Sequence, residues 1–350
     1  MLAASYASLD AALDTLSDYG SGLANGNFNH APMVAEALCA MGRQEAVMPW
    51  LERYRQRLLP RGAPDEPIRA DRWHQALGRR DGFAAWGEFF AEELRRAAWP
   101  TVLDTWTARL APGVSAAATH GAIRVGHAVR ALSVAATPTR RRELGDALAS
   151  WAASYRELPA ASAATPGRLT PRLALAAIPI VPPERRRPGS ITAALAGLAE
   201  FPEFAPKVAA AELGGDIAPL LAELTELFTR VYLANVRDVP TAIAFIHGVT
   251  SLTALGHIAP HVEEATARSL LRYGWQAGCG LYACYGGGTA FATDIASVDE
   301  DPDSLIERAL ANGDEHVIKF TEACLYRHRL MPAAAYPAAA RHVRGVIGAR

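Results

Sequence analysis

Apolar residues recur at intervals of three and four through most of this 350-residue chain, whereas segments of strict alternation are scarce. The first spacing places apolar side chains on one face of an α-helix, and alternation would be expected of a half-buried strand. Half of the residues are hydrophobic, so the helices can bury a sizeable core. We therefore predict an all-α fold, a large domain of a dozen or more helices.

The stretch 116–132 is strongly helical in its pattern and nearly free of charge, with Arg124 and Arg130 as its only permanently charged residues. A helix that is apolar on all sides has no face that favours water. We therefore predict a central, buried helix at this place.

The chain changes character in the stretch 159–190, where prolines are frequent. Proline lacks a backbone N–H and clashes with the preceding turn, so it does not fit inside a regular helix. We expect an irregular crossover here, or a lid over a site. The prediction is a single domain, 1–350, in which this crossover joins two helical halves, 1–158 and 191–330.

The balance of charge gives no reason to expect a nucleic acid or an anionic membrane as partner, because 35 basic residues face 36 acidic ones. The stretch 1–16 lacks the basic start and the continuous apolar run of a secretory signal. No run of about eighteen apolar residues is found, and the closest, 173–181, is stopped by two prolines. Four cysteines make no disulfide framework and are expected to be reduced thiols. We predict a cytoplasmic protein; its oligomeric state is left open.

Four of the ten histidines lie in segments that are otherwise short of charge: His30, His120, His127 and His247. An imidazole inside an apolar helix must hydrogen-bond or bind a ligand, because leaving it unsatisfied is costly. Taken singly, each is most simply explained as a satisfied core histidine. Several in one chain favour a functional site, provided that the fold brings them together.

Spacing separates the roles of two of these histidines. His120 and His127 are seven residues apart and share a helix face, but two turns place them about 10 Å apart along the axis. They can line one pocket, yet they cannot ligate one ion in a regular helix. One is expected to be a ligand and the other a pocket or supporting group.

A second pair of neighbours lies near the end of the chain. His316 and Lys319 are three residues apart and face the same way, and Glu322 follows three residues later on that face. Without further information, the lysine and the glutamate are most simply a surface ion pair on an amphipathic helix.

Four segments, in order along the chain, resemble motifs of the questin oxidase-like family, first defined as a domain of unknown function. They are Asn29-His30 with Pro32 and Glu36, His120-Gly121 through Arg124 to His127, Phe245-Ile246-His247-Gly248, and His316 through Lys319-Phe320 to Cys324. The resemblance covers nearly the whole chain.

The resemblance implies a function. Members of this family are similar enzymes of fungal aromatic polyketide pathways, which oxidise anthraquinone-type rings or open them by Baeyer–Villiger-like or oxygenative cleavage. At least one member is understood to hold non-haem iron through histidines and a lysine carboxylated on its side-chain nitrogen. Carried over to this chain, the expected cofactor is Fe(II), with dioxygen as co-substrate and a small aromatic molecule as substrate. The candidate metal ligands are His30, His120, His247, His316 and Lys319.

Two further residues are candidates for the chemistry itself. His127 is expected to act beside the metal, and it could exchange roles with His316. Arg124, on the nearly uncharged helix, could pair with a phenolate or a peroxide intermediate. The alternative for Arg124 is a structural ion pair with a buried acid.

Several common catalytic motifs are absent from the sequence. No GxGxxG follows a strand, so a flavin or nicotinamide domain is unsupported, and a use of NADPH would have no recognised binding motif. Neither GxSxG nor HExxH occurs. The resemblance to the questin oxidase-like family implies an oxidoreductase, a monooxygenase or dioxygenase. The alternatives are a metal-dependent hydrolase that uses a carboxylated lysine, and a non-catalytic helical binding protein.

Overall fold

The computed structural model describes residues 6–160 and 167–349. The prediction of an all-α fold is confirmed, because sixteen α-helices lie in these residues and account for most of them. The helices are α1 (Leu9–Leu16), α2 (Ala31–Ala40), α3 (Val47–Tyr54), α4 (Phe83–Arg96), α5 (Trp99–Leu110), α6 (His120–Val134), α7 (Pro138–Ala153), α8 (Pro171–Ala176), α9 (Ile191–Ala196), α10 (Phe204–Val208), α11 (Ile217–Asn235), α12 (Val239–Ile258), α13 (Glu264–Tyr285), α14 (Pro302–Asn312), α15 (Glu315–Leu330) and α16 (Ala335–Val346).

A small antiparallel ribbon interrupts the helical pattern. Strand β1 (Tyr19–Leu23) pairs with β2 (Leu58–Pro60), with Tyr19 opposite Pro60 and Leu23 opposite Leu58. A ribbon this short has too few residues to show an alternating pattern, which explains why the sequence did not reveal it.

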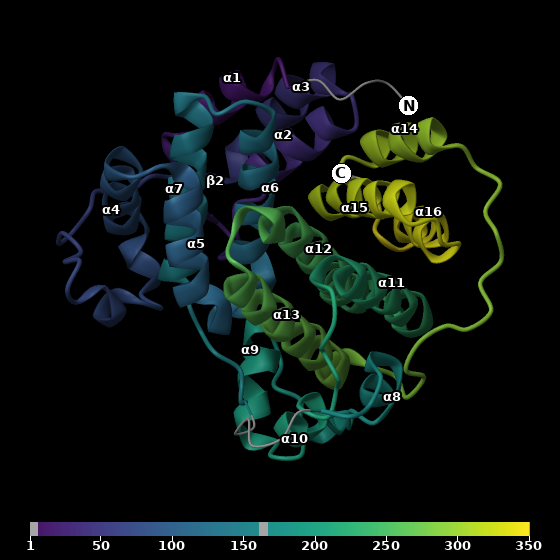
Figure 1. Ribbon diagram of the computed structural model, residues 1–350. Helices are drawn as coiled ribbons and strands as arrows, with labels where there is room; N and C mark the ends of the chain where they lie inside the picture. The colour runs from purple at the N-terminus through teal and green to yellow at the C-terminus, as the bar shows by residue number, and fades with distance from the viewer. Residues whose placement is uncertain (1–5, 161–166, 350) are drawn as a thin grey trace.

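Four helices form the part of the core that carries the candidate site. Helix α2 packs on α6, α6 on α12, α12 on α15, and α15 on α2, so the contacts close into a ring. Figure 1 shows α11, α12 and α13 near the middle of the molecule, with α4, α5 and α7 on one side and α15 and α16 on the other. We call α2, α6, α12 and α15 the core ring.

Helix α12 is the most apolar member of the core ring. The stretch Val239–His261 is long and apolar enough to cross a membrane by length and composition, yet 78% of it is buried inside the protein. This corrects the expectation that 173–181 is the closest approach to such a stretch. Threonine, serine, glycine and histidine interrupt the apolar run of α12, although the average remains high. Burial within the protein identifies it as a core helix.

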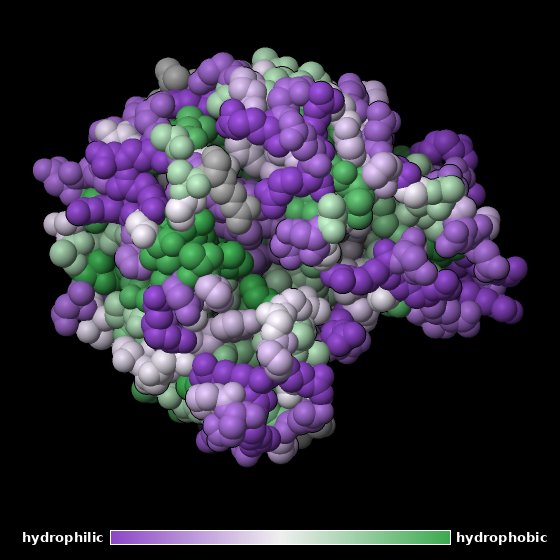
Figure 2. Space-filling model, turned by 180° about the vertical axis from the view of Figure 1, so that it is seen from behind, coloured by the Kyte–Doolittle hydropathy of each residue, from purple (hydrophilic) through white to green (hydrophobic). Residues whose placement is uncertain are grey.

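The outer surfaces of the helices carry most of the polar residues. Seen from behind, the molecule is largely hydrophilic, with a hydrophobic area to the left of the centre (Figure 2). Few large apolar side chains are exposed, and those of Leu173 and Leu330 are among the most exposed. The apolar faces that the spacing predicted are therefore turned inward.

The described part of the proline-rich crossover holds the short helix α8 and one 3₁₀ turn (Pro183–Arg185), and the rest of it up to α9 is irregular. Residues 161–166 of the predicted crossover lie outside the described residues. The crossover is anchored to α13, because the Val181 amide donates to the Ala283 carbonyl at 2.8 Å. Whether the two halves form one domain stays a prediction.

The buried helix predicted for 116–132 begins later than expected. Helix α6 starts at His120, and the three residues before it adopt left-handed conformations, with φ of 52° at Ala117, 54° at Ala118 and 69° at Thr119. Residues other than glycine rarely adopt such values, and three in succession are exceptional. Alanine carries no sequence signal for this turn.

Candidate metal centre

His30 stands at the N-terminus of α2 and is almost fully buried. The Asn29 side chain accepts the Ala31 amide at 2.9 Å, and the His30 amide donates to the Tyr54 hydroxyl at 3.0 Å. The Asn29 side chain thus satisfies an amide at the start of α2, although the cap position itself belongs to His30. These bonds fix the backbone from which the imidazole projects into the core ring.

Two more imidazoles meet His30 from other helices. The Nε2 atoms of His30 and His120 lie 2.7 Å apart, and those of His120 and His247 lie 3.4 Å apart. The Nδ1 atom of His120 lies 2.5 Å from the Ala117 carbonyl, and that of His247 lies 2.6 Å from the Ile243 carbonyl. A carbonyl only accepts, so both Nδ1 atoms carry the hydrogen. Both Nε2 atoms are left with a free lone pair, which is the tautomer that binds a metal.

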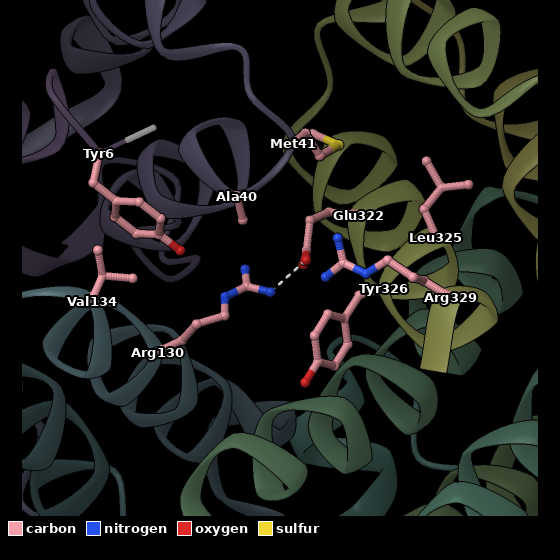
Figure 3. Close-up of a pocket in the computed structure, with 9 residues that line it drawn as sticks. All are labelled: Tyr6, Ala40, Met41, Arg130, Val134, Glu322, Leu325, Tyr326 and Arg329. Carbon is pink, nitrogen blue, oxygen red and sulfur yellow. Dashed lines mark hydrogen bonds and ion pairs between the residues drawn. The ribbon is translucent and has the colours of Figure 1, made fainter. Parts of the chain in front are cut away.

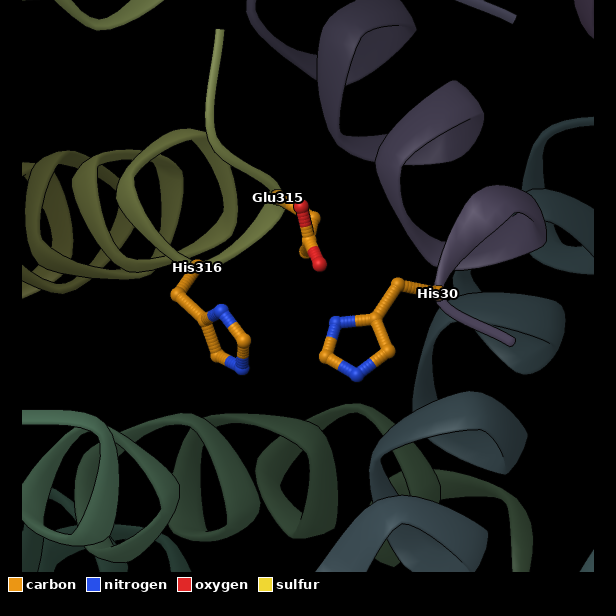
Figure 4. Close-up of side chains that lie close together, drawn as sticks. All are labelled: His30, Glu315 and His316. Carbon is orange, nitrogen blue, oxygen red and sulfur yellow. The ribbon is translucent and has the colours of Figure 1, made fainter. Parts of the chain in front are cut away.

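His316 joins the group from the start of α15. Its amide donates to the Asp314 carboxylate at 2.8 Å, and its ring centroid lies 4.7 Å from that of His30. Donor atoms of His30, Glu315 and His316 all lie within 4.8 Å of one another. Figure 4 shows these three side chains turned toward one another from α2 and α15. We call His30, His120, His247 and His316 the histidine cluster.

Glu315 was not among the residues singled out from the sequence. Its carboxylate is buried and accepts two hydrogen bonds from Arg57, at 3.1 and 3.3 Å. The only available signal was its position directly before His316, and adjacent helical residues usually point in different directions. Tertiary packing alone brings its oxygen near the imidazoles.

Lys319 lies inside the protein at the same place. Its side chain is buried, and within the described part of the chain its ammonium has one hydrogen-bond partner, the Met33 thioether at 3.9 Å. Burial lowers the pKa of Lys319 to about 8, although Glu315 and Asp314 oppose the shift. The simple explanation of a surface pair with Glu322 is therefore wrong.

Lys319 is also one of only two lysines in the chain, the other being the exposed Lys207. Subtracting these two from the 35 basic residues leaves 33 arginines. The chain uses arginine at nearly all of its basic positions. The basic residue buried beside the imidazoles is nevertheless a lysine, Lys319. This choice indicates chemistry that a guanidinium does not offer, since arginine keeps its proton under all ordinary conditions.

The electrostatics of the cluster favour neutral imidazoles. Burial lowers the pKa values of His30, His120 and His247 well below the ordinary histidine value, and the neighbouring charges of Lys319 and the other imidazoles lower them further. His30 and His120 also lie at helix N-termini, where the helix dipole disfavours a positive charge. Neutral imidazole is the form that ligates metal ions.

The cluster has the features of a cation site. Among the described residues, the Nδ1 atom of His30 is buried without a hydrogen-bond partner, and its Nε2 faces a lone pair of His120. Whichever nitrogen carries the hydrogen, one buried nitrogen of His30 stays unsatisfied, which is costly. Two imidazole nitrogens bound to one ion at the usual 2.0–2.1 Å lie about 3 Å apart, close to the separations seen here. A metal ion would satisfy the lone pairs that now face one another.

A second polar group lies farther along α2, α6 and α15, and Tyr6 joins it from the segment before α1. The Glu36 carboxylate accepts hydrogen bonds from Tyr6 and Arg130, and it lies 2.6 Å from His127 Nδ1. Arg130 also donates to Glu322 at 2.5 Å, as Figure 3 shows at the edge of a small hollow of about 120 Å³. We call these five residues the charge network.

On α2 and α6, buried apolar residues follow the histidines of the cluster and precede the members of the charge network along the chain. Met33, Ile123 and Ala254 form a small buried apolar group of their own, on α2, α6 and α12. His127 contacts Glu36, and among the described residues it has no hydrogen bond to the imidazoles of the cluster, as expected from its seven-residue distance from His120. Its proposed catalytic role and its exchange with His316 stay predictions.

Arg124 forms a buried ion pair between α6 and α7. Its Nε and Nη2 atoms donate to the two carboxylate oxygens of Glu143 at 2.7 and 2.8 Å. Both side chains are almost entirely buried. This geometry matches the structural alternative for Arg124, while a contact with substrate stays a prediction.

The fold and the site define a class, an all-α protein with four buried imidazoles and a buried lysine gathered in one core ring. The model of the family described as Questin oxidase-like matches residues 28–324, and the chain belongs to this family. The resemblance inferred from the four motifs is confirmed. The family indicates an enzyme, an oxidoreductase that acts on anthraquinone-like substrates. A search of curated proteins found no match.

Proposed function

We propose that this protein is a non-haem iron-dependent oxygenase that inserts oxygen into, or cleaves, a quinone-like or aromatic polyketide ring. The observation that carries the proposal is the meeting of the His30, His120 and His247 imidazoles, with Nε2 atoms 2.7 and 3.4 Å apart, in a buried site that also contains Lys319. Imidazole nitrogens together with an anionic oxygen donor suit Fe(II).

In this proposal the histidine cluster and Lys319 hold the iron, with Lys319 carboxylated on Nζ. Bound iron supplies the one-electron chemistry that allows dioxygen to react with an organic ring. The carbonyls of Ala117 and Ile243 orient two of the imidazoles, because each accepts an Nδ1 hydrogen. The surrounding helices exclude water from the cluster, which lies inside the core ring.

Carboxylation of Lys319 requires a neutral amine. The Nζ lone pair forms a bond to the carbon of carbon dioxide, the nitrogen loses a proton, and the product is a negatively charged carbamate. Burial favours this reaction because it lowers the pKa of Lys319 to about 8, so that a neutral fraction exists near pH 7. The carbamate in turn supplies a negative charge beside the neutral imidazoles of His30, His120 and His247.

The proposal is tested by metal analysis of the protein purified without chelator, together with carbon-13 NMR after exposure to labelled bicarbonate. Wild type is expected to hold roughly one iron per chain and to show one carbamate signal. The variant K319R keeps a positive charge but cannot form a carbamate, so it should lose both. The variant K207R is the matched control, because it changes the only other lysine and should lose neither.

Other outcomes would contradict the proposal. Unchanged iron in K319R would show that Lys319 is not a ligand. Stoichiometric zinc, without oxygen consumption on hydroxyanthraquinones, would favour the metal-dependent hydrolase instead. Consumption of NADPH in step with dioxygen would indicate a monooxygenase rather than a ring-cleaving dioxygenase, because a monooxygenase needs two external electrons to reduce the second oxygen atom to water, whereas cleavage that incorporates both atoms needs none.

A further inference from the structure

A hollow of about 440 Å³ adjoins the histidine cluster through Glu315, which lines it. The donor atoms of Glu315 and of two imidazoles of the cluster lie within 4.8 Å of one another. Tyr54 also lines the hollow, and its hydroxyl accepts the His30 amide at 3.0 Å. Of the residues of the hollow, Glu315 therefore lies beside two imidazoles and Tyr54 holds the backbone of His30. Its volume lies within the range of small-molecule sites.

One wall of this hollow is aromatic and firmly held. Trp50 and Tyr54, one turn apart on α3, stack with their ring centroids 4.6 Å apart. The Trp50 indole N–H donates to the Gly313 carbonyl at 2.9 Å, which ties α3 to the start of α15. Because both rings are held from behind, they offer a fixed apolar edge to a planar ligand.

Two arginines but only one carboxylate are among the residues that line the hollow. The Arg57 guanidinium lies 4.7 Å from the centroid of the Tyr54 ring. It donates two hydrogen bonds to the Glu315 carboxylate. Arg53 also lines the hollow, is exposed, and forms no ion pair with the other described residues. Because Arg57 pairs with Glu315, the guanidinium of Arg53 is available to bind an anion.

A larger hollow, of about 900 Å³, lies elsewhere, against α10 and α13. It is lined by residues such as Val208, Arg268 and Trp275, and it includes no member of the histidine cluster. Size alone would favour it, but none of the residues that line it belongs to the histidine cluster or is shown in contact with it. We therefore favour the smaller hollow, because Glu315, which lines it, lies beside the imidazoles of the histidine cluster.

We propose that the hollow lined by Trp50, Arg53 and Tyr54 binds the anionic end of a planar aromatic molecule. Arg53 pairs with a carboxylate or phenolate, for which the planar guanidinium fork is suited, and the aromatic wall contacts the ring. The proposal rests on the proposed function, since it makes this hollow the port through which the substrate reaches the histidine cluster.

The test measures the binding of 2-naphthoate by isothermal titration calorimetry, with neutral 2-naphthalenemethanol as the uncharged probe. Each is titrated into wild type and R53Q, both as purified and after removal of metal by chelator. The variant R55Q is the matched control, because Arg55 is two residues away and exposed but pairs with Glu52 and does not line the hollow.

We expect R53Q to weaken the binding of 2-naphthoate about three- to tenfold, the loss of one charge-assisted hydrogen bond near the surface. The neutral probe should bind R53Q and wild type equally, and R55Q should match wild type. Equal binding of 2-naphthoate to R53Q and wild type would overturn the proposal, as would a lack of binding at millimolar concentration.

The result is separable from that of the proposed function. Binding that depends on Arg53 and persists in a protein without iron would support the hollow while the iron proposal fails. Stoichiometric iron with binding that is indifferent to Arg53 would support the iron site and reject the hollow.

Discussion

The Nδ1 atom of His120 lies 2.5 Å from the carbonyl oxygen of Ala117, three residues earlier in the chain. In an ordinary helix that carbonyl would point along the axis toward a backbone amide. Here the left-handed turn at Ala117, Ala118 and Thr119 turns it toward the imidazole. Left-handed conformations cost non-glycine residues about 1–2 kcal/mol each, and such strain is concentrated at functional sites. We infer that the turn is retained because it orients His120.

Replacing Ala118 by glycine tests this strain. Glycine adopts φ of 54° without penalty, so the variant A118G should relieve strain. The variant A128G lies in the right-handed part of α6 and relieves none, so it serves as the control. Both changes remove one buried methyl group. We expect A118G to cost about 1–2 kcal/mol less in unfolding free energy than A128G, measured by urea denaturation. Equal losses in the two variants would show that the turn is unstrained.

The charge network is expected to stabilise the fold and to weaken in acid. Burial opposes the ionisation of Glu36, but Arg130 and His127 overcome it and hold its pKa well below the usual value. A carboxyl group with a depressed pKa stabilises the fold above its unfolded pKa of about 4.3, and this contribution is lost as the pH falls toward the folded value.

The variant E36Q removes this charge and leaves Arg130 with Glu322 alone. We expect a loss of about 3–5 kcal/mol in unfolding free energy at pH 7, and a difference from wild type that shrinks below about pH 4. The exposed Glu52 gives the matched variant E52Q, which should change stability by less than about 0.5 kcal/mol. A difference that stays constant with pH would contradict this account of the network.

The pair of Arg124 and Glu143 is expected to be structural. The variant R124M alone leaves the Glu143 carboxylate buried without its partner and should cost about 3–5 kcal/mol. The double variant R124M/E143L removes both charges and should recover most of that loss. Thermal unfolding and oxygen consumption on a hydroxyanthraquinone measure stability and activity separately. Full stability with lost activity in the double variant would instead support a contact between Arg124 and the substrate.

The sequence by itself determined most of the local structure. Helix α11 (Ile217–Asn235) is an example, because its apolar residues repeat with the helical period over five turns, and this spacing predicts a helix whatever the tertiary fold. The same reasoning placed His120 and His127 in different surroundings, since two turns of helix separate them whatever the tertiary fold. The four motifs identified the family because they are local strings of residues.

Only the tertiary structure decided which residues meet. The three-residue spacing of Lys319 and Glu322 is the same on an exposed helix and on a buried one, but α15 is covered by α2, α12 and α16, so both side chains lie inside. Glu315 approaches the imidazoles, and His30 meets His120 across ninety residues, through contacts that no local pattern encodes. Periodicity reports which face of a helix is apolar, whereas the partner of that face depends on how all the helices pack together.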